Sequence, residues 1–275
     1  MDPNVAGSSP VDRPFFQPVN VSLLQAILLG LVQGLTEFFP VSSSAHLRLA
    51  KWFLGLSDGE RLLYFDLICH AGTLFALIFF LRKEVWSVLL SVKKMALYTA
   101  ALIPLVPAYF LLKPIRLAAS DPAYLGYFLL FTSLLLFAAS SKNASQMPLG
   151  KWKSVLCIGV MQTMALIPGI SRSGSTISAA RFCGWQWREA AEFSFLLSIP
   201  AILGGQVLES LKLLGGPAEA ASIGWPCYLG GFASSFLVGL ITVRFVFWIY
   251  EKEKVRPFAW YCLGAALVAW VIFNG

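Results

Sequence analysis

Two short segments of this chain place reactive side chains beside a proline that interrupts an apolar stretch. In the first, residues 30–46, Gln33 and Glu37 precede the proline, and serines and a histidine follow it. In the second, residues 159–176, a proline and a glycine precede hydroxyl residues on both sides of Arg172. Charged and polar groups are costly inside hydrocarbon, so in a membrane segment they mark a functional site. We therefore expect the chemistry of this protein at the two interruptions.

The first segment offers a base, a nucleophile and an anion site within a few residues. Gln33 and Glu37 are four residues apart, so both project from one helical face and can bind a hard divalent cation or a hydroxyl. Pro40 ends this helix, and the next helix begins with hydroxyls and free backbone N–H groups that suit an anion, at Ser42, Ser43 and Ser44. His46 lies three residues beyond Ser43, within reach of a proton on a hydroxyl or on a bound phosphate.

Each of these residues also has a structural interpretation. A buried side chain can bond the backbone that the interruption frees, and for Gln33 alone we favour that role. At least one of the three serines is expected to be an ordinary helix N-cap. A lone histidine is usually structural, but His46 shares its segment with a carboxylate and serines, whereas nothing near His70 in the sequence resembles a site. For Glu37 we favour function, because a carboxylate at membrane depth needs a partner and Arg172 is available.

The second segment has the composition of a phosphate-binding turn. Gly169 permits a tight turn, and Gly174 allows the backbone to approach an anion. Arg172 supplies a forked cation that matches phosphate oxygens. Because the interruption should lie well inside the hydrophobic span, we do not favour the alternative that Arg172 extends to the membrane interface. Further hydroxyls stand at Ser171, Ser173 and Thr176. Together the two segments suit a phosphate group carried by a lipid.

The elements that position these residues are predicted by composition and by apolar runs. The chain is 57% hydrophobic and 13% charged, with a mean hydropathy of +0.72, which excludes a soluble domain of 275 residues. We predict an all-α polytopic membrane protein whose spans have about 20 residues each. The six spans cover residues 62–81, 95–112, 124–140, 193–211, 228–250 and 258–273. Residues 21–52 and 155–185 are interrupted near their centres, so we interpret them as re-entrant helical hairpins.

The two interrupted segments share a spacing that indicates an internal repeat. Gly30 and Gln33 recur at one offset as Gly159 and Gln162, and each segment continues to a proline and serines. Each unit would be a hairpin followed by three spans, over about residues 19–140 and 150–275. Because three is odd, the second unit is inverted relative to the first, which predicts an inverted repeat with its site at the midplane.

The charge distribution indicates membrane topology and no nucleic-acid binding. The net charge of +7 is spread over short loops, and we expect the loops rich in lysine and arginine to be cytoplasmic. The first hairpin then enters from outside, the second from the cytoplasm, and both termini are external. Three cations run against this count, namely Arg48, Lys51 and Arg61.

The remaining features describe one membrane domain. We expect this domain over residues 19–275, after a mobile tail, residues 1–18, that is not a cleaved signal. The five cysteines lie in or beside apolar segments without metal-ligand spacing. We therefore expect them to be small core residues that form no disulfide.

The two motifs resemble the signature of a known family. Residues 33–46, QGLTEFFPVSSSAH, and residues 168–176, PGISRSGST, are similar to the paired motifs of the bacterial undecaprenyl-diphosphate phosphatases of the bacitracin-resistance type. The similarity covers nearly the whole chain after the tail and includes residues 192–200, EFSFLLSIP. The acidic motif of that family is commonly (E/Q)-x-x-x-E, and this chain has the glutamine form at Gln33.

The resemblance implies hydrolysis of undecaprenyl diphosphate at the external face of the bacterial inner membrane, which recycles the lipid carrier for peptidoglycan and other envelope glycans. It implies catalytic roles for Glu37, Ser43, His46 and Arg172. Binding of the phosphates is then expected at Ser42, Ser171, Ser173, Thr176, Gly169 and Gly174. It further implies a divalent cation, Mg²⁺ or Ca²⁺, and a homodimer. Glu37 and Gln33 are the candidate ligands of the cation by their spacing.

Two mechanisms and one other function fit these residues. Ser43 attacks the terminal phosphorus while His46 or Glu37 takes its proton, or water activated by Glu37 attacks with His46 as the acid. An inverted-repeat transporter or flippase of the lipid carrier monophosphate is the alternative function, because broken helices are typical of transporters. A phosphatidic-acid-type phosphatase is disfavoured, since its second site histidine is missing from a chain with two histidines in all.

Overall fold

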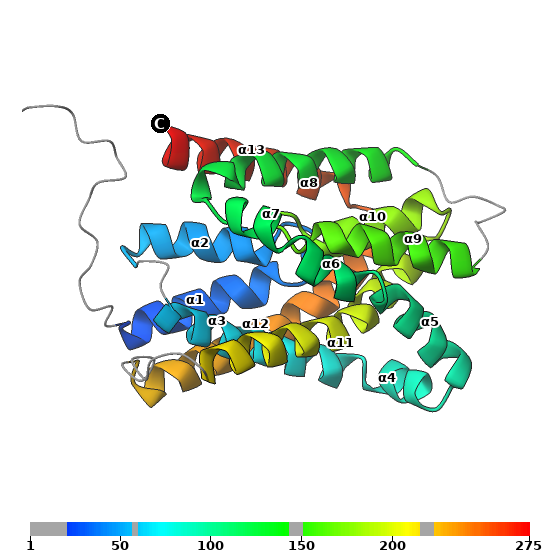
Figure 1. Cartoon of the computed structure of the whole chain (residues 1–275), viewed down its shortest axis with the longest axis horizontal. Coiled ribbons are helices and arrows are strands. Elements are labelled where there is room, and N and C mark those ends of the chain that lie inside the picture. Colours follow the sequence, from blue (N-terminus) through cyan, green and yellow to red (C-terminus); the bar gives the residue numbers. More distant parts are fainter. Residues whose placement is uncertain (1–20, 57–59, 143–150, 215–222) are drawn as a thin grey trace, which may run out of the picture.

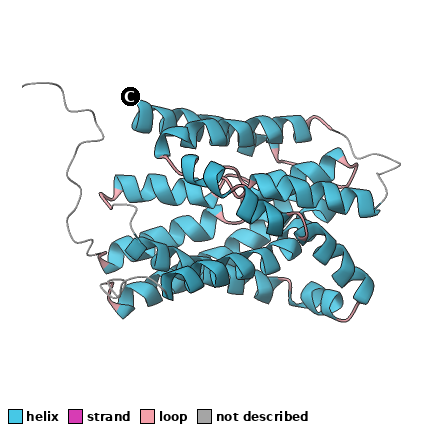
Figure 2. Ribbon diagram, in the orientation of Figure 1, coloured by secondary structure: helices cyan, strands magenta, loops and turns pink. Residues whose placement is uncertain are grey.

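The structure is a bundle of helices, with no strand in the described part of the chain (Figure 1, Figure 2). It is a computed structural model that describes residues 21–56, 60–142, 151–214 and 223–275. The tail at residues 1–18 lies outside the described residues. The helices are α1 (Leu23–Thr36), α2 (Ser43–Phe53), α3 (Glu60–Phe80), α4 (Arg82–Leu89), α5 (Val92–Leu102), α6 (Leu105–Leu111), α7 (Lys113–Ala118), η1 (Pro122–Tyr124), α8 (Leu125–Ser140), α9 (Lys151–Met164), α10 (Arg172–Phe182), α11 (Trp187–Leu214), α12 (Trp225–Glu251) and α13 (Arg256–Asn274).

Six stretches of helix are long and apolar enough to cross a membrane, as the sequence predicts. They are Leu62–Phe80, Val92–Leu111, Pro122–Ser140, Trp187–Leu211, Trp225–Glu251 and Arg256–Asn274. The second stretch is broken between α5 and α6, where Pro104 lacks a backbone donor. Large apolar side chains such as Phe110, Ile241 and Val271 are more than half exposed on the outer surface, which is typical of contact with lipid. The chain is therefore a multi-pass membrane protein.

Two shorter helix pairs, α1–α2 and α9–α10, form hairpins that are interrupted around the prolines noted in the sequence. In Figure 1 the two hairpins approach from opposite sides, and their tips meet near the centre of the molecule. Hydrogen bonds join the tips. Ser173 Oγ donates to the Phe39 carbonyl at 3.2 Å, and the Gly169 N–H donates to Ser44 Oγ at 3.5 Å. The predicted interruption of both segments is therefore confirmed.

The two hairpins pack on different crossing helices in a corresponding way. Helix α1 packs against α12 and α3, whereas α9 packs against α5 and α6. A Cβ on Gly30 would lie 2.5 Å from the Gly231 carbonyl oxygen, and one on Gly159 would lie 2.5 Å from the Ala101 carbonyl oxygen. Only glycine allows membrane helices to approach this closely. Gly30 and Gly159 thus make the same kind of contact in the two hairpins.

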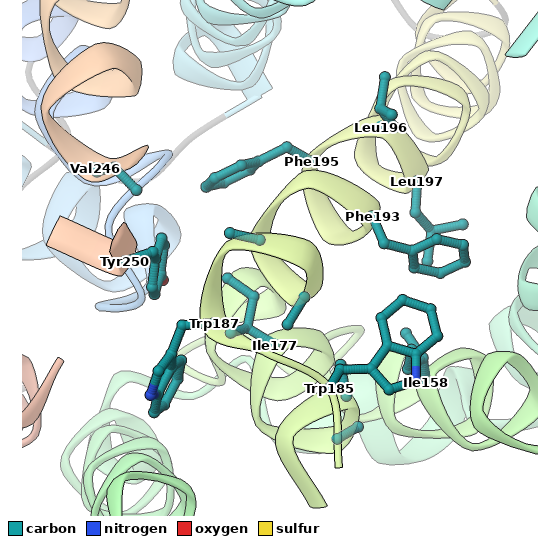
Figure 3. Close-up of a cluster of buried hydrophobic side chains, with 14 of the residues drawn as sticks. Ile158, Ile177, Trp185, Trp187, Phe193, Phe195, Leu196, Leu197, Val246 and Tyr250 are labelled. Carbon is teal, nitrogen blue, oxygen red and sulfur yellow. The ribbon is translucent and has the colours of Figure 1, made fainter. Parts of the chain in front are cut away.

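The main cluster of buried apolar side chains lies where α10, α11 and α12 meet (Figure 3). Trp187 stacks on Tyr250 with ring centroids 6.0 Å apart, and Trp185 meets Phe193 edge-on at 5.3 Å. Each such aromatic pair contributes about 0.5–1.5 kcal/mol beyond the area that it buries. Ile177 of α10 is fully buried in the same cluster. The cluster therefore anchors the helix that begins at Arg172.

The five cysteines are free, as the sequence predicts, and four of them are buried. Burial raises the pKa of the Cys183 thiol, which lies in a turn outside the spans, to about 11. This thiol is therefore neutral at physiological pH and behaves as a small core residue.

Two of the three cations that run against the predicted orientation have structural roles. Lys51 is buried, and its Nζ donates to Asp66 Oδ2 at 2.6 Å. Arg48 Nη1 donates to the Ser120 carbonyl at 2.6 Å. The side chain of Arg61 lies outside the described residues. The positions of Arg48 and Lys51 are thus explained by their partners.

Candidate active site

Glu37 is the centre of the polar contacts between the two hairpins. Its carboxylate is buried and accepts hydrogen bonds from both of them. Arg172 Nη2 donates to Oε1 at 2.6 Å, and Ser43 Oγ donates to Oε2 at 2.7 Å. Gln33 Nε2, one helical turn earlier, also donates to Oε2 at 2.9 Å. The structure thus brings together Glu37, Ser43 and Arg172, three of the four predicted catalytic residues, with Gln33, the predicted metal ligand. The roles of all four stay predictions.

Glu37, Ser43 and Arg172 border a cavity of about 240 Å³ that lies between the hairpin tips. Its polar wall contains Glu37, Ser43, Ser44, Ser171, Arg172 and Ser173. Apolar residues from α6, α11 and the turn after α9 complete the lining, among them Leu105, Ala165, Leu166, Ala201 and Ile202. A cavity with a cation and hydroxyls on one wall and apolar groups on another suits a phosphate attached to a hydrocarbon chain.

Ser42, at the start of α2, has an unusual backbone conformation. Its φ of 71° and ψ of 94° lie in a region that non-glycine residues rarely adopt, which costs about 1–3 kcal/mol. The residue occupies the N-cap position, yet its side chain makes no capping bond and lies 3.2 Å from Ser44 Oγ. The ordinary N-cap expected among the three serines is therefore not formed. The strained turn directs the hydroxyl of the next residue, Ser43, onto Glu37.

His46 holds this strained turn in place. Its Nδ1 donates to the Ser42 carbonyl at 2.8 Å, because a carbonyl can only accept, and Nε2 of the neutral ring accepts from the Tyr261 hydroxyl at 2.8 Å. The residue is not among those that line the cavity. The sequence predicts that His46 exchanges a proton with Ser43, but the structure engages both ring nitrogens elsewhere. A direct part for His46 in proton transfer stays a prediction.

His70 was not predicted as a site residue, and the structure places it on the wall of the cavity. Its Nε2 lies 3.8 Å from Glu37 Oε2, and its Nδ1 donates to the Asp66 carbonyl at 2.8 Å. Because that carbonyl keeps a proton on Nδ1, the neutral ring presents Nε2 to the cavity as an acceptor, and the protonated ring pairs with Glu37. No neighbour of His70 in the sequence signals this position, since the crossing of α3 past α1 creates it.

The second hairpin contributes an ordinary helix cap and a tight turn. Ser171 is the N-cap of α10, and its Oγ accepts from the Gly174 N–H at 3.1 Å. Gly169 has a φ of 100°, which favours glycine, so the predicted turn is present. Ser171 and Ser173 line the cavity, whereas Thr176 is buried one turn further along α10. Gly169, Gly174 and Thr176 are thus not among the lining residues, whereas the two serines border the space itself.

The donor set of the cavity fits a metal ion only together with a substrate. No group of three His, Cys, Asp or Glu side chains that could hold a metal occurs within the described ranges. Among the described residues Glu37 supplies the only carboxylate on the cavity wall. Gln33 lies behind it, off the wall, with its Nε2 on Glu37. Magnesium often binds through one or two carboxylates together with substrate phosphates, and Glu37 fits that mode.

Comparison with known proteins identifies relatives over most of the chain. The family model described as bacitracin resistance protein BacA matches residues 26–268, which include the tips of both hairpins and every residue that lines the cavity. An undecaprenyl-diphosphatase of Protochlamydia amoebophila is 39% identical over 256 residues, or 92% of this chain and 100% of the relative. The undecaprenyl-diphosphatase of Carboxydothermus hydrogenoformans is 38% identical, over 86% of this chain and 92% of the relative. That of Rubrobacter xylanophilus is 37% identical, over 90% and 98% respectively.

Proposed function

The chain belongs to the BacA family of bacitracin resistance proteins, and we propose that it hydrolyses undecaprenyl diphosphate to undecaprenyl phosphate and inorganic phosphate. The relatives are named for that activity. The strongest structural support is the contact of Ser43 Oγ with Glu37 Oε2 at 2.7 Å, beside Arg172, on the wall of a cavity with an apolar lining. Phosphoryl transfer needs a nucleophile on a base next to a cation that binds phosphate.

Ser43 is the nucleophile in this proposal, and Glu37 is its base. As the Ser43 oxygen bonds to the terminal phosphorus, its proton passes to Glu37 Oε2, and the bond from that phosphorus to the bridging oxygen breaks. Undecaprenyl phosphate leaves with the bridging oxygen, and Ser43 carries the phosphoryl group. Water then attacks this phosphorus, the departing Ser43 oxygen takes the proton back from Glu37, and inorganic phosphate is released.

Arg172 and the two helix starts hold the diphosphate in this proposal. Helices α2 and α10 begin at the cavity, and free backbone N–H groups at a helix start bind anions. Arg172 Nη1 donates to the Ser198 carbonyl at 3.3 Å, which orients the guanidinium beside Glu37. A divalent cation, Mg²⁺ or Ca²⁺, on Glu37 and the phosphate oxygens would supply further compensation of the charge that develops in transfer. Gln33 would orient the carboxylate for it.

The proposal includes the placement of the site in the membrane. The matching contacts of α1 and α9, with the glycines that make them, support an inverted repeat of two re-entrant hairpins. The loops assigned to the cytoplasm are rich in lysine and arginine, so in this proposal the first hairpin enters from the opposite side. The site then opens to the external face of the bacterial inner membrane, where the carrier is recycled. The homodimer implied by the sequence belongs to the same proposal, and cross-linking in membranes tests it.

A flippase of the lipid monophosphate is not favoured. Such a protein needs an anion site and a path for the lipid, both of which the cavity could offer. It has no need of a serine hydroxyl held on a buried carboxylate, which is the contact that Ser43 makes with Glu37. The names of the relatives also describe hydrolysis.

Purified protein in detergent is expected to release phosphate from undecaprenyl diphosphate, and EDTA is expected to lower that rate at least about hundredfold. Without the cation, less of the charge on the transferring phosphoryl group is compensated, and such losses are typically of this size. Phosphate release with EDTA, and after addition of Mg²⁺ or Ca²⁺, measures the effect. Full activity in EDTA would remove the cation from the proposal. No release from well-folded protein would overturn the phosphatase function.

The Tyr261→Phe variant is expected to lose about fivefold in kcat with little change in KM. It lacks the hydroxyl on His46 Nε2, a bond of about 1 kcal/mol, so the Ser42 turn and the Ser43 hydroxyl are less well oriented. The matched control is Tyr127→Phe, which removes the hydroxyl that accepts a hydrogen bond from Trp270 Nε1 between α8 and α13, away from the cavity. Equal effects of the two substitutions on kcat would show that Tyr261 does not position the nucleophile.

A further inference from the structure

Gln162 is a buried polar side chain of the cavity that the scheme above does not use. It lies near the end of α9, is 2% exposed and lines the cavity. Neither its Oε1 nor its Nε2 has a hydrogen-bond partner within the part of the chain that the structure describes. Buried amides in native proteins are nearly always satisfied, so an unpaired one that faces a cavity points to a ligand.

The equivalent glutamine of the first hairpin makes the contrast clear. Gln33 corresponds to Gln162 in the sequence repeat, and its Nε2 is occupied by Glu37 at 2.9 Å. The second hairpin has Thr163, Leu166 and other uncharged residues in the turn after Gln162, and no carboxylate there. Gln162 therefore keeps its donor for a group that enters the cavity.

Gln162 lies on the apolar side of the cavity. Ala165 and Leu166 follow it by three and four residues and line the same space. Helix α6, which adds Leu105 to the lining, packs directly on α9. A diphosphate whose terminal phosphorus lies at Ser43 and Arg172 must direct its hydrocarbon toward apolar residues. The phosphate that carries the hydrocarbon then lies next to Gln162.

We propose that Gln162 Nε2 donates a hydrogen bond to a non-bridging oxygen of the lipid-bound phosphate, the one that is not transferred. This assignment rests on the proposed function and deepens it, because Gln162 becomes the residue that distinguishes a prenyl diphosphate from a ligand with a single phosphate. Because the Gln162 amide is neutral, its hydrogen bond to an anionic phosphate oxygen holds the phosphate less strongly than a cationic side chain would. The lipid monophosphate is therefore free to leave once the terminal phosphoryl group has been transferred.

The test is the Gln162→Met variant, which keeps the length of the side chain and removes its polar atoms. KM for undecaprenyl diphosphate is expected to rise about tenfold or more, the effect of one hydrogen bond to a charged group. Competitive inhibition by inorganic phosphate, which occupies the terminal position, is expected to be unchanged. The thermal midpoint is expected to stay level or rise, because the unliganded protein loses an unpaired buried amide.

The controls separate this inference from the function itself. Gln206→Met removes a glutamine whose Nε2 donates to the Leu67 carbonyl outside the cavity, and its KM should match the wild type. Gln162→Glu keeps the shape of the side chain but places a carboxylate next to the phosphate. Its KM for undecaprenyl diphosphate should therefore be higher than that of Gln162→Met. The assignment would be overturned if the KM of Gln162→Met for undecaprenyl diphosphate were unchanged. It would also be overturned if inhibition by inorganic phosphate weakened as much as KM rose. In both cases phosphate release by the wild type would still support the phosphatase function. Absence of release from the wild type would overturn the function instead.

Discussion

The Arg172→Ala variant is expected to release phosphate from undecaprenyl diphosphate at least about 1000-fold more slowly than the wild type. Arg172 Nη2 lies 2.6 Å from Glu37 Oε1, in a contact that is largely shielded from solvent. The substitution removes a donor to the phosphate. It also leaves a buried carboxylate without its partner, which lowers the free energy of unfolding by about 3–5 kcal/mol. An arginine that compensates the charge on a transferring phosphoryl group is worth about 10³–10⁵ in kcat, which sets the expected size of the loss in rate. Initial rates of phosphate release at saturating Mg²⁺ measure it.

Two further variants separate the loss of phosphate binding from a loss of folding. Arg188→Ala breaks an exposed ion pair with Glu251 and should keep activity within about twofold of the wild type. The double variant Glu37→Gln with Arg172→Ala removes both buried charges, so its stability should recover relative to Arg172→Ala while its activity stays low. If Arg172→Ala alone kept a tenth of the wild-type rate, Arg172 would not be at the phosphate.

The Ser43→Ala variant is expected to lose at least about 1000-fold in kcat, because the attacking oxygen is absent. Ser43 Oγ is the hydroxyl that donates to Glu37 at 2.7 Å. Wild-type protein quenched in acid during turnover should carry a phosphoryl group on Ser43, detected by mass spectrometry with substrate labelled in its terminal phosphate. Ser44→Ala is the matched control, since Ser44 also lines the cavity but bonds to Ser42, and its rate should fall less than tenfold.

Near-normal turnover of Ser43→Ala, without a labelled serine in the wild type, would identify water as the nucleophile. Glu37 would then remain the base, because its carboxylate borders the same cavity. The Arg172→Ala result would keep its meaning in either case, since both mechanisms place the terminal phosphate at the guanidinium. The two variants thus test the nucleophile and the phosphate site separately.

The hairpins and spans could be predicted from sequence because their signals are local. Pro40 and Pro168 each stop an apolar helix, and the serines after them mark the next helix start. The apolar runs have the length that a membrane requires, so all six spans were found. The break of the second span at Pro104 was not predicted, although a proline within an apolar run is the usual signal for one.

The contact of Glu37 with Arg172 was predictable, whereas the environments of the two histidines were not. A buried carboxylate needs a cation, and Arg172 stands at the corresponding break of the other hairpin. The place of each histidine depends on the helix that crosses beside it. Tyr261 on α13 engages His46, and α3 carries His70 to Glu37. Such contacts join distant parts of the chain, and hydrophobic periodicity carries no information about them.

The origin of the two central charges in different hairpins constrains how this protein evolves. Glu37 belongs to the first hairpin and Arg172 to the second. A substitution of either residue alone leaves the other as a buried unpaired charge. Such a substitution destabilises the protein and is selected against. A lineage can therefore alter the pair only by changing both residues together. A hairpin grafted from a relative therefore has to bring a charge that its new partner can neutralise.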